Sequence, residues 1–269
     1  MSAFTAALPT LLALGLTLSA LIWLGRQLSF HLQTLAFRLS RSPDFTTLFL
    51  FIVLLPGIFI HESAHWLAAK LMGLKTGTFR VWPKRQGKQI ALGSVSVERG
   101  NRWQESFVGV APLLVGSLLV VWIGQQIFDT PLLSATWRQG HWLEAFTNFW
   151  QAIRERDGAL WGYLLFTVAN AMIPSEPDRE PFPVVVLYMV LAVTLYFVFG
   201  LPLAPFASAL AWLTPRLGEL VTAFVLTIVL DGLILLPLVL INNTAQPSAP
   251  PPTHKRVRRQ GNKRLKAKG

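Results

Sequence analysis

Three residues of this chain, His61, Glu62 and His65, have the types and the spacing of a zinc-dependent hydrolytic site. On a helix, residues four positions apart lie one above the other, so the two imidazoles can bind the same Zn²⁺ ion. Glu62 is placed to accept a proton from a water molecule that the metal activates, rather than to bind the metal itself. The pattern therefore predicts a helical metal site with Glu62 as the catalytic base.

This HExxH pattern stands inside a hydrophobic run, from residue 45 to residue 72, that is long enough to cross a bilayer. The pentapeptide also occurs by chance, and a helical histidine is more often a packed core residue than a ligand. Ionisable side chains are costly inside a membrane span, however, and are usually retained for a function. The membrane setting therefore favours a metal site over a structural pair of histidines.

The composition is that of an integral membrane protein. Of the 269 residues, 52% are hydrophobic and only 14% are charged, whereas soluble domains carry about 25% charged residues. Much of the net charge of +11 lies in the C-terminal tail, which argues against a globular nucleic-acid-binding domain. The chain has no cysteine, so histidine and carboxylate remain as its strong zinc ligands.

Six apolar segments are expected to cross the bilayer, so we predict an all-α polytopic membrane protein. Residues 26–44 carry leucines at helical spacing between arginines, which indicates a helix at the membrane interface. Clustered tryptophans in residues 129–158 are typical of the same level. The six segments cover about residues 8–25, 45–72, 105–128, 159–173, 182–203 and 220–241.

One stretch departs from the helical pattern. Apolar and polar residues alternate around Phe79 and again around Val95, which is typical of strands, and the residues from Pro83 to Lys88 between them have the composition of a turn. We expect a small β-hairpin over Thr76–Val97, directly after the HExxH helix. An ordinary polar loop is the alternative.

Basic residues predict the orientation, because they gather on the cytoplasmic side of membrane proteins. With a cytoplasmic N-terminus, most of the 24 Lys and Arg residues lie inside, in the stretch 70–102 and in the tail. We therefore expect a multi-pass protein with both termini in the cytoplasm. His65 is then close to the cytoplasmic end of its span, and Asp178 reaches the same level.

A catalytic zinc ion usually has three protein ligands, so one more is needed. His31 and His141 lie on the opposite side in this topology and His254 lies in the tail, which leaves a carboxylate. Asp178 follows the fourth apolar segment at the expected depth. Asp231 lies midway along the sixth segment, where a carboxylate is costly and therefore suggests a function.

The residues that follow the HExxH pattern resemble those of the site-2 protease family of intramembrane zinc metallopeptidases. That family places Ala four and Gly eight residues after the second histidine, as Ala69 and Gly73 stand after His65 here. Its members have β-strands after this helix and a later Asn-x-x-Pro motif leading to Leu-Asp-Gly, whose Asp is the third zinc ligand. The resemblance covers the second to fourth apolar segments.

The resemblance implies roles for Asn170 and Asp178. Asn170 precedes Asp178 by eight residues, the spacing common in the family, but the proline is displaced by one position to Pro174, and Asp178 stands in Pro-Asp-Arg. Asp231 stands in Leu-Asp-Gly but lacks the asparagine and proline before it. We therefore favour Asp178 as the third ligand, with Asp231 as the alternative. By the resemblance, Asn170 helps to hold the substrate or the oxyanion.

The expected organisation has four parts. Residues 1–44 hold the first span and the interfacial helix, and residues 45–180 the metallopeptidase core. Residues 181–243 hold two further spans, and residues 244–269 form a disordered basic cytoplasmic tail. Such a tail can contact anionic lipid, and we expect no specific nucleic-acid partner.

The expected function is a zinc-dependent metalloendopeptidase. Zn²⁺ held by His61, His65 and Asp178, with Glu62 as the base, is expected to hydrolyse peptide bonds of membrane-embedded or membrane-adjacent proteins or peptides. The alternative is a membrane protein that binds zinc without hydrolysing anything, such as a transporter or a degenerate peptidase. Glu62 favours catalysis, because such a site needs no carboxylate at that position.

Overall fold

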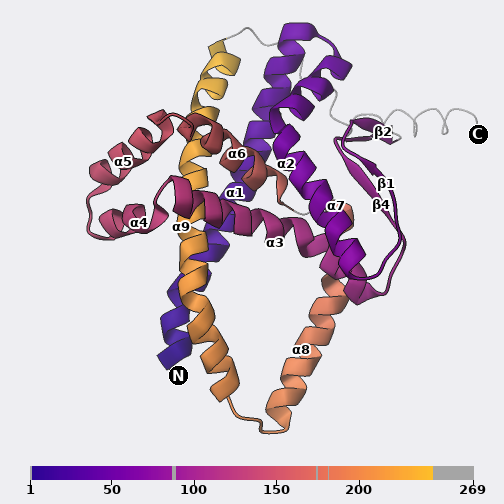
Figure 1. Ribbon diagram of the computed structural model, residues 1–269, viewed down its shortest axis with the longest axis vertical. Coiled ribbons are helices and arrows are strands. Elements are labelled where there is room, and N and C mark those ends of the chain that lie inside the picture. Colours follow the sequence, from indigo (N-terminus) through magenta and orange to yellow (C-terminus); the bar gives the residue numbers. More distant parts are fainter. Residues whose placement is uncertain (1, 87–88, 174, 181, 245–269) are drawn as a thin grey trace, which may run out of the picture.

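The computed structural model describes residues 2–86, 89–173, 175–180 and 182–244, and these are mainly helical (Figure 1). Outside the described residues lie residues 245–269 of the tail expected to be disordered, Gly87 and Lys88 of the expected turn, and Pro174. The elements are, in chain order, α1 (Ser2–Ser40), α2 (Pro43–Leu71), β1 (Thr76–Arg80), β2 (Lys84–Gln86), β3 (Gln89–Ala91), β4 (Ser94–Val97), α3 (Arg102–Ile127), α4 (Thr130–Arg138), α5 (Trp142–Arg154), α6 (Gly158–Ala171), α7 (Glu176–Arg179), α8 (Phe182–Val198) and α9 (Ala204–Thr244).

Four helices of the described part, α1, α2, α3 and α9, are long and apolar enough to cross a membrane. They match four of the six predicted spans. The other two predicted spans form shorter helices: α8 has 17 residues, and α6 has 14, which makes it about 21 Å long against a hydrocarbon core of about 30 Å. Six full spans are therefore not confirmed. No residue of α8 is buried, and its side chains are apolar on every side, as in a helix that faces lipid.

The first helix differs from the prediction, because α1 runs unbroken from Ser2 to Ser40 and does not end near Gly25. The leucines that suggested a separate interfacial helix continue the buried face of α1: Leu28 and Leu32 are both buried in the main core. Helix propagation adds a hydrogen bond at each residue, so a continuous helix that buries these side chains is favoured over a break. Arg26 therefore lies in the middle of α1 and not at a helix boundary.

The helices α1 and α9 pack along each other and run in the same direction (Figure 1). In the first half of each helix, Pro9 of α1 and Val221 of α9 line the same apolar pocket. Near the end of each helix, Arg38 of α1 donates a hydrogen bond to the Asn242 carbonyl of α9 at 2.6 Å. Six spans with both termini in the cytoplasm require the first and last spans to run in opposite directions. In the structure α1 and α9 are parallel, and the side of the membrane on which each terminus lies stays a prediction.

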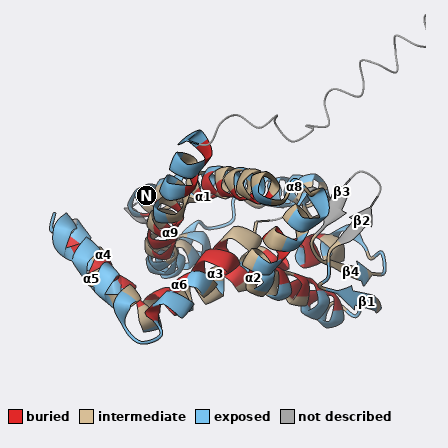
Figure 2. Ribbon diagram, turned by 90° about the horizontal axis from the view of Figure 1, so that it is seen from above, coloured by how far each residue is buried: buried red, intermediate tan, exposed pale blue. Residues whose placement is uncertain are grey.

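The main core gathers where α1, α3, α6 and α9 meet, and it includes Leu21, Val120, Leu165 and Phe224. The buried residues are concentrated around α3 and its neighbours α2 and α6, whereas α4 and α5 form a hairpin that projects from this body (Figure 2). This hairpin contains the tryptophans expected near the membrane surface, including Trp137 and Trp142, whose ring centroids are 4.3 Å apart. The helical body, and not the hairpin, positions the HExxH helix.

The strands after α2 form the expected antiparallel pair, with β1 against β4 and Phe79 opposite Val95. The segment predicted as the turn is different: β2 and β3 form a second antiparallel pair there, with Arg85 opposite Ile90. The expected turn therefore falls partly within a strand. Sequence alternation identified β1 and β4, but the polar composition of residues 84–86 conceals a strand whose pairing comes from its neighbour.

Candidate metal centre

The two histidines of the HExxH pattern lie one turn apart on α2 and face each other. This helix begins where Ser42 accepts a hydrogen bond from the Phe45 N–H, with Pro43 in the first turn. His61 and His65 have ring centroids 4.7 Å apart, and their Nε2 atoms are separated by 3.1 Å. The local helical geometry thus brings two nitrogen atoms to one point, as the spacing predicted.

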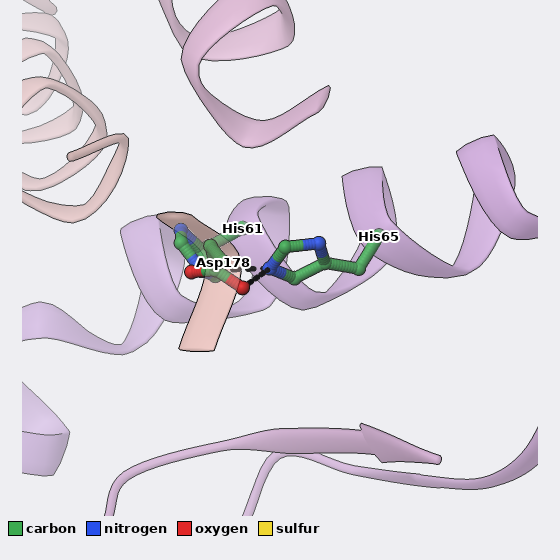
Figure 3. A group of neighbouring side chains, drawn as sticks. All are labelled: His61, His65 and Asp178. Atoms are coloured by element: carbon green, nitrogen blue, oxygen red, sulfur yellow. Dashed lines mark hydrogen bonds and ion pairs between the residues drawn. The ribbon is translucent and has the colours of Figure 1, made fainter. Parts of the chain in front are cut away.

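Asp178 approaches the two histidines from α7 (Figure 3). Its Oδ1 lies 3.3 Å from His65 Nε2, and its Oδ2 lies 3.8 Å from His61 Nε2. Ser175 sets the direction of this carboxylate, because its backbone N–H and its hydroxyl both donate to Asp178 Oδ2, at 2.7 and 2.5 Å. The Ser-x-x-Asp spacing is that of a capping interaction at a helix start.

Two backbone carbonyls fix the orientation of the imidazoles. His61 Nδ1 lies 2.7 Å from the Ala171 oxygen at the end of α6, and His65 Nδ1 lies 2.9 Å from the Val108 oxygen of α3. A carbonyl oxygen only accepts, so both Nδ1 atoms carry the proton, and each Nε2 of a neutral ring is an acceptor. Three acceptors therefore converge, and only a positive charge between them makes that arrangement favourable.

The donor set fits a zinc ion. Described His, Asp and Glu residues form one such group, His61, His65 and Asp178, whose ligand atoms all lie within 4.8 Å of one another. Two nitrogens bound to one tetrahedral zinc ion are separated by about 3.3 Å, and the Nε2 atoms here are 3.1 Å apart. Metal-binding histidines commonly donate their other N–H to a carbonyl, as both do here. The structure therefore provides two nitrogens and one carboxylate and leaves room for a fourth ligand.

Glu62 lies beside this group, buried to 9% exposure, and lines the same cleft. Gly93, between β3 and β4, packs directly against it: a Cβ built on Gly93 would come within 2.8 Å of the Glu62 carboxylate oxygen. Any side chain at position 93 would have to displace that carboxylate. The strand segment thus covers one side of Glu62 and leaves its other side toward the cleft.

The cleft has a volume of about 1220 Å³ and is bounded by α2, β4, the start of α3, the end of α6 and α7. Val95 and Val97 contribute its β-strand wall, and His61, His65 and Asp178 line it as well. A volume of this size exceeds that of most small-ligand pockets, which hold about 300–1,000 Å³. A smaller and more apolar pocket of about 370 Å³, between α1, α4, α5 and α9, contains none of the site residues.

Asn170 and Asp231 are joined to each other. The Asn170 amide donates to Asp231 Oδ1 at 3.0 Å and to the Phe166 carbonyl at 2.9 Å. Asp231 is therefore engaged with Asn170 and is not a member of the group that meets at the histidines. Asn170 does line the cleft, but its donors point to these two acceptors, so its expected contact with the substrate or the oxyanion stays a prediction.

Sequence patterns did not identify the residues that orient the side chains of the site. A serine three residues before Asp178 is a recognisable capping pattern, so Ser175 could have been found in this way. The carbonyls of Val108 and Ala171 carry no such signal, because every residue has one. Gly93 could not have been identified either, since only the fold brings it to Glu62.

Comparison of the chain with protein-family models, with curated proteins and with solved structures found no match. What the chain does must therefore be inferred from its own site.

Proposed function

We propose that this chain is a membrane-embedded zinc metallopeptidase of the site-2 protease type, acting on peptide bonds within or next to the bilayer. The observation that supports it most is the convergence of three acceptors, from His61, His65 and Asp178, beside a buried Glu62. This site lies on a helix long and apolar enough to cross a membrane. Buried ionisable groups in such a helix are costly and mark a functional site.

His61, His65 and Asp178 are the residues that would hold the ion. Zn²⁺ bound there would make a water molecule acidic and would polarise the carbonyl that the water attacks. Glu62 accepts the proton from the attacking water and then donates it to the leaving amine, so it acts first as base and then as acid. The β4 wall and Gly93 limit the access of bulk water to Glu62.

A zinc-binding protein that hydrolyses nothing is the competing function. Such a protein needs the three ligands but neither a buried glutamate next to them nor a cleft of about 1220 Å³ that reaches them. Both features favour hydrolysis.

The purified full-length chain in detergent is expected to retain about one zinc ion per molecule, the stoichiometry of a three-ligand catalytic site. Zinc content by elemental analysis and cleavage of an unstructured membrane-tethered peptide are to be measured together. A chelator should remove both the metal and the cleavage, and added zinc should restore them. A chain that retains no zinc after purification in zinc-containing buffer would remove the proposal.

We also propose that α1 and α9 cross the membrane in the same direction, so that the two termini lie on opposite faces. The hydrogen bond from Arg38, near the end of α1, to Asn242, near the end of α9, supports this direction. The charge distribution instead favours six spans with both termini in the cytoplasm. The chain has no cysteine, so one cysteine at the N-terminus and, separately, Asn243→Cys give clean reporters. An impermeant thiol reagent should label them from opposite sides of sealed vesicles. Labelling from one side would restore the six-span topology.

A further inference from the structure

The last turn of α6 lies where several helices meet. Ala171, at its end, provides the carbonyl that accepts the His61 Nδ1 proton. Glycines of three other helices allow this close approach: a Cβ at Gly25 of α1, Gly57 of α2 or Gly116 of α3 would overlap with atoms of residues 167–172. The orientation of His61 therefore depends on a turn that the surrounding helices hold in place.

The fourth contact to this turn, from α9, is polar. Asp231 is fully buried, and its Oδ1 accepts a hydrogen bond from Asn170, one residue before Ala171. Its Oδ2 has no hydrogen-bond partner among the described residues. A buried carboxylate with an unsatisfied oxygen is destabilising, and an apolar side chain would pack at lower cost. Asp231 is therefore poorly explained as a packing residue.

We propose that Asp231 is a positioning residue of the metal centre. By holding the Asn170 amide, Asp231 keeps the last turn of α6 in the conformation in which the Ala171 carbonyl accepts the His61 proton. That hydrogen bond sets which ring nitrogen of His61 is free to bind a metal and where it points. The inference rests on the proposed metal site and adds to it a residue from a helix that supplies no ligand.

Substitutions distinguish a positioning residue from a metal ligand and from a packing residue, because the three roles differ in their effects on metal binding, metal geometry and stability. A ligand cannot be replaced by asparagine without losing the metal. A packing residue affects stability but not the geometry of the metal. For a positioning residue, Asp231→Asn keeps an oxygen that accepts from Asn170, whereas Asp231→Ala removes it.

Cobalt(II) binding by the full-length chain in detergent is the measurement, because the visible spectrum of Co²⁺ reports ligand geometry as well as affinity. Asp231→Ala is expected to weaken Co²⁺ binding about tenfold, the scale measured for partners that orient metal ligands, and to alter the spectrum. Asn170→Ala should have the same effect. The double variant should bind Co²⁺ no more weakly than either single variant, because both substitutions remove the same hydrogen bond, between Asn170 and Asp231. Asp231→Asn should bind like the wild type.

Thr227→Val is the matched control. Thr227 lies one turn earlier on α9, is equally buried, and bonds only to the Ala223 carbonyl of its own helix. Its substitution is expected to leave Co²⁺ binding and spectrum unchanged.

Wild-type affinity and spectrum in both Asp231→Ala and Asn170→Ala would overturn the inference. Complete loss of Co²⁺ in Asp231→Asn would also overturn it and make Asp231 a ligand. If Asp231→Ala does not fold, Asn170→Ala and Asp231→Asn decide the matter by the same spectrum. A wild-type chain that binds no Co²⁺ would overturn the proposed function and this inference with it, whereas binding that is insensitive to both alanine variants refutes the inference alone.

Discussion

Glu62→Gln is expected to abolish peptide cleavage while leaving the metal site intact. Glutamine has nearly the same shape, so it can occupy the same space against Gly93, but its amide cannot accept a proton from water. General acid and base catalysis contributes about 10²- to 10⁴-fold to rates, so a loss of that size is expected in kcat. The measurements are the turnover of a membrane-tethered peptide and the zinc content of the same preparation.

Glu105→Gln is the control for this substitution. It removes the same charge at the rim of the same cleft, where Glu105 is paired with Arg102 at 3.3 Å and not with the histidines. Most of the activity should remain in this variant. Cleavage by Glu62→Gln at the wild-type rate would show that Glu62 is not the base and would favour the function of a zinc-binding protein without hydrolysis.

Asp178→Ala is expected to lose both the metal and the activity. The substitution removes one of the three proposed ligands and leaves, of this group of described residues, the two Nε2 atoms that are 3.1 Å apart. The loss of zinc affinity should exceed the roughly 10- to 100-fold that is typical when a residue that only orients a ligand is removed. Titration with zinc in competition with a chelator of known affinity measures it.

Glu180→Ala controls for the loss of a carboxylate from the same segment. Glu180 is exposed, lines the cleft two residues after Asp178, and is not part of the group that meets at the histidines. Its zinc affinity should stay at the wild-type level. Full zinc content in Asp178→Ala would refute the ligand set, and loss of zinc in Asp231→Asn in its place would transfer the third position to Asp231.

The local part of the site followed directly from the sequence. His61 and His65 are four residues apart in an apolar run, and helical geometry alone brings such residues to one face. The strands β1 and β4 were also predictable, because their alternation is local. The second strand pair, β2 and β3, was not, because its pairing partner rather than its composition defines it.

The relation between distant helices was beyond the reach of sequence patterns. Loop charges predicted opposite directions for the first and last spans, yet α1 and α9 are parallel. The choice between Asp178 and Asp231 as the third ligand was likewise open. Asp178 follows one apolar segment and Asp231 lies midway along another, and the sequence does not show which of them comes near the histidines. Packing brings Asp178 to the histidines and Asp231 to Asn170.

By itself the sequence determined that the chain is apolar enough for a membrane, that it is mainly helical, and that two imidazoles and a glutamate share one helix. Tertiary structure alone decided which carboxylate meets the imidazoles, which carbonyls orient them, and which helix restrains the turn that carries Ala171. The physical reason is range. Periodicity and propensity act over a few residues, whereas a metal centre joins atoms more than a hundred residues apart, from His61 to Asp178, through packing that no local pattern encodes.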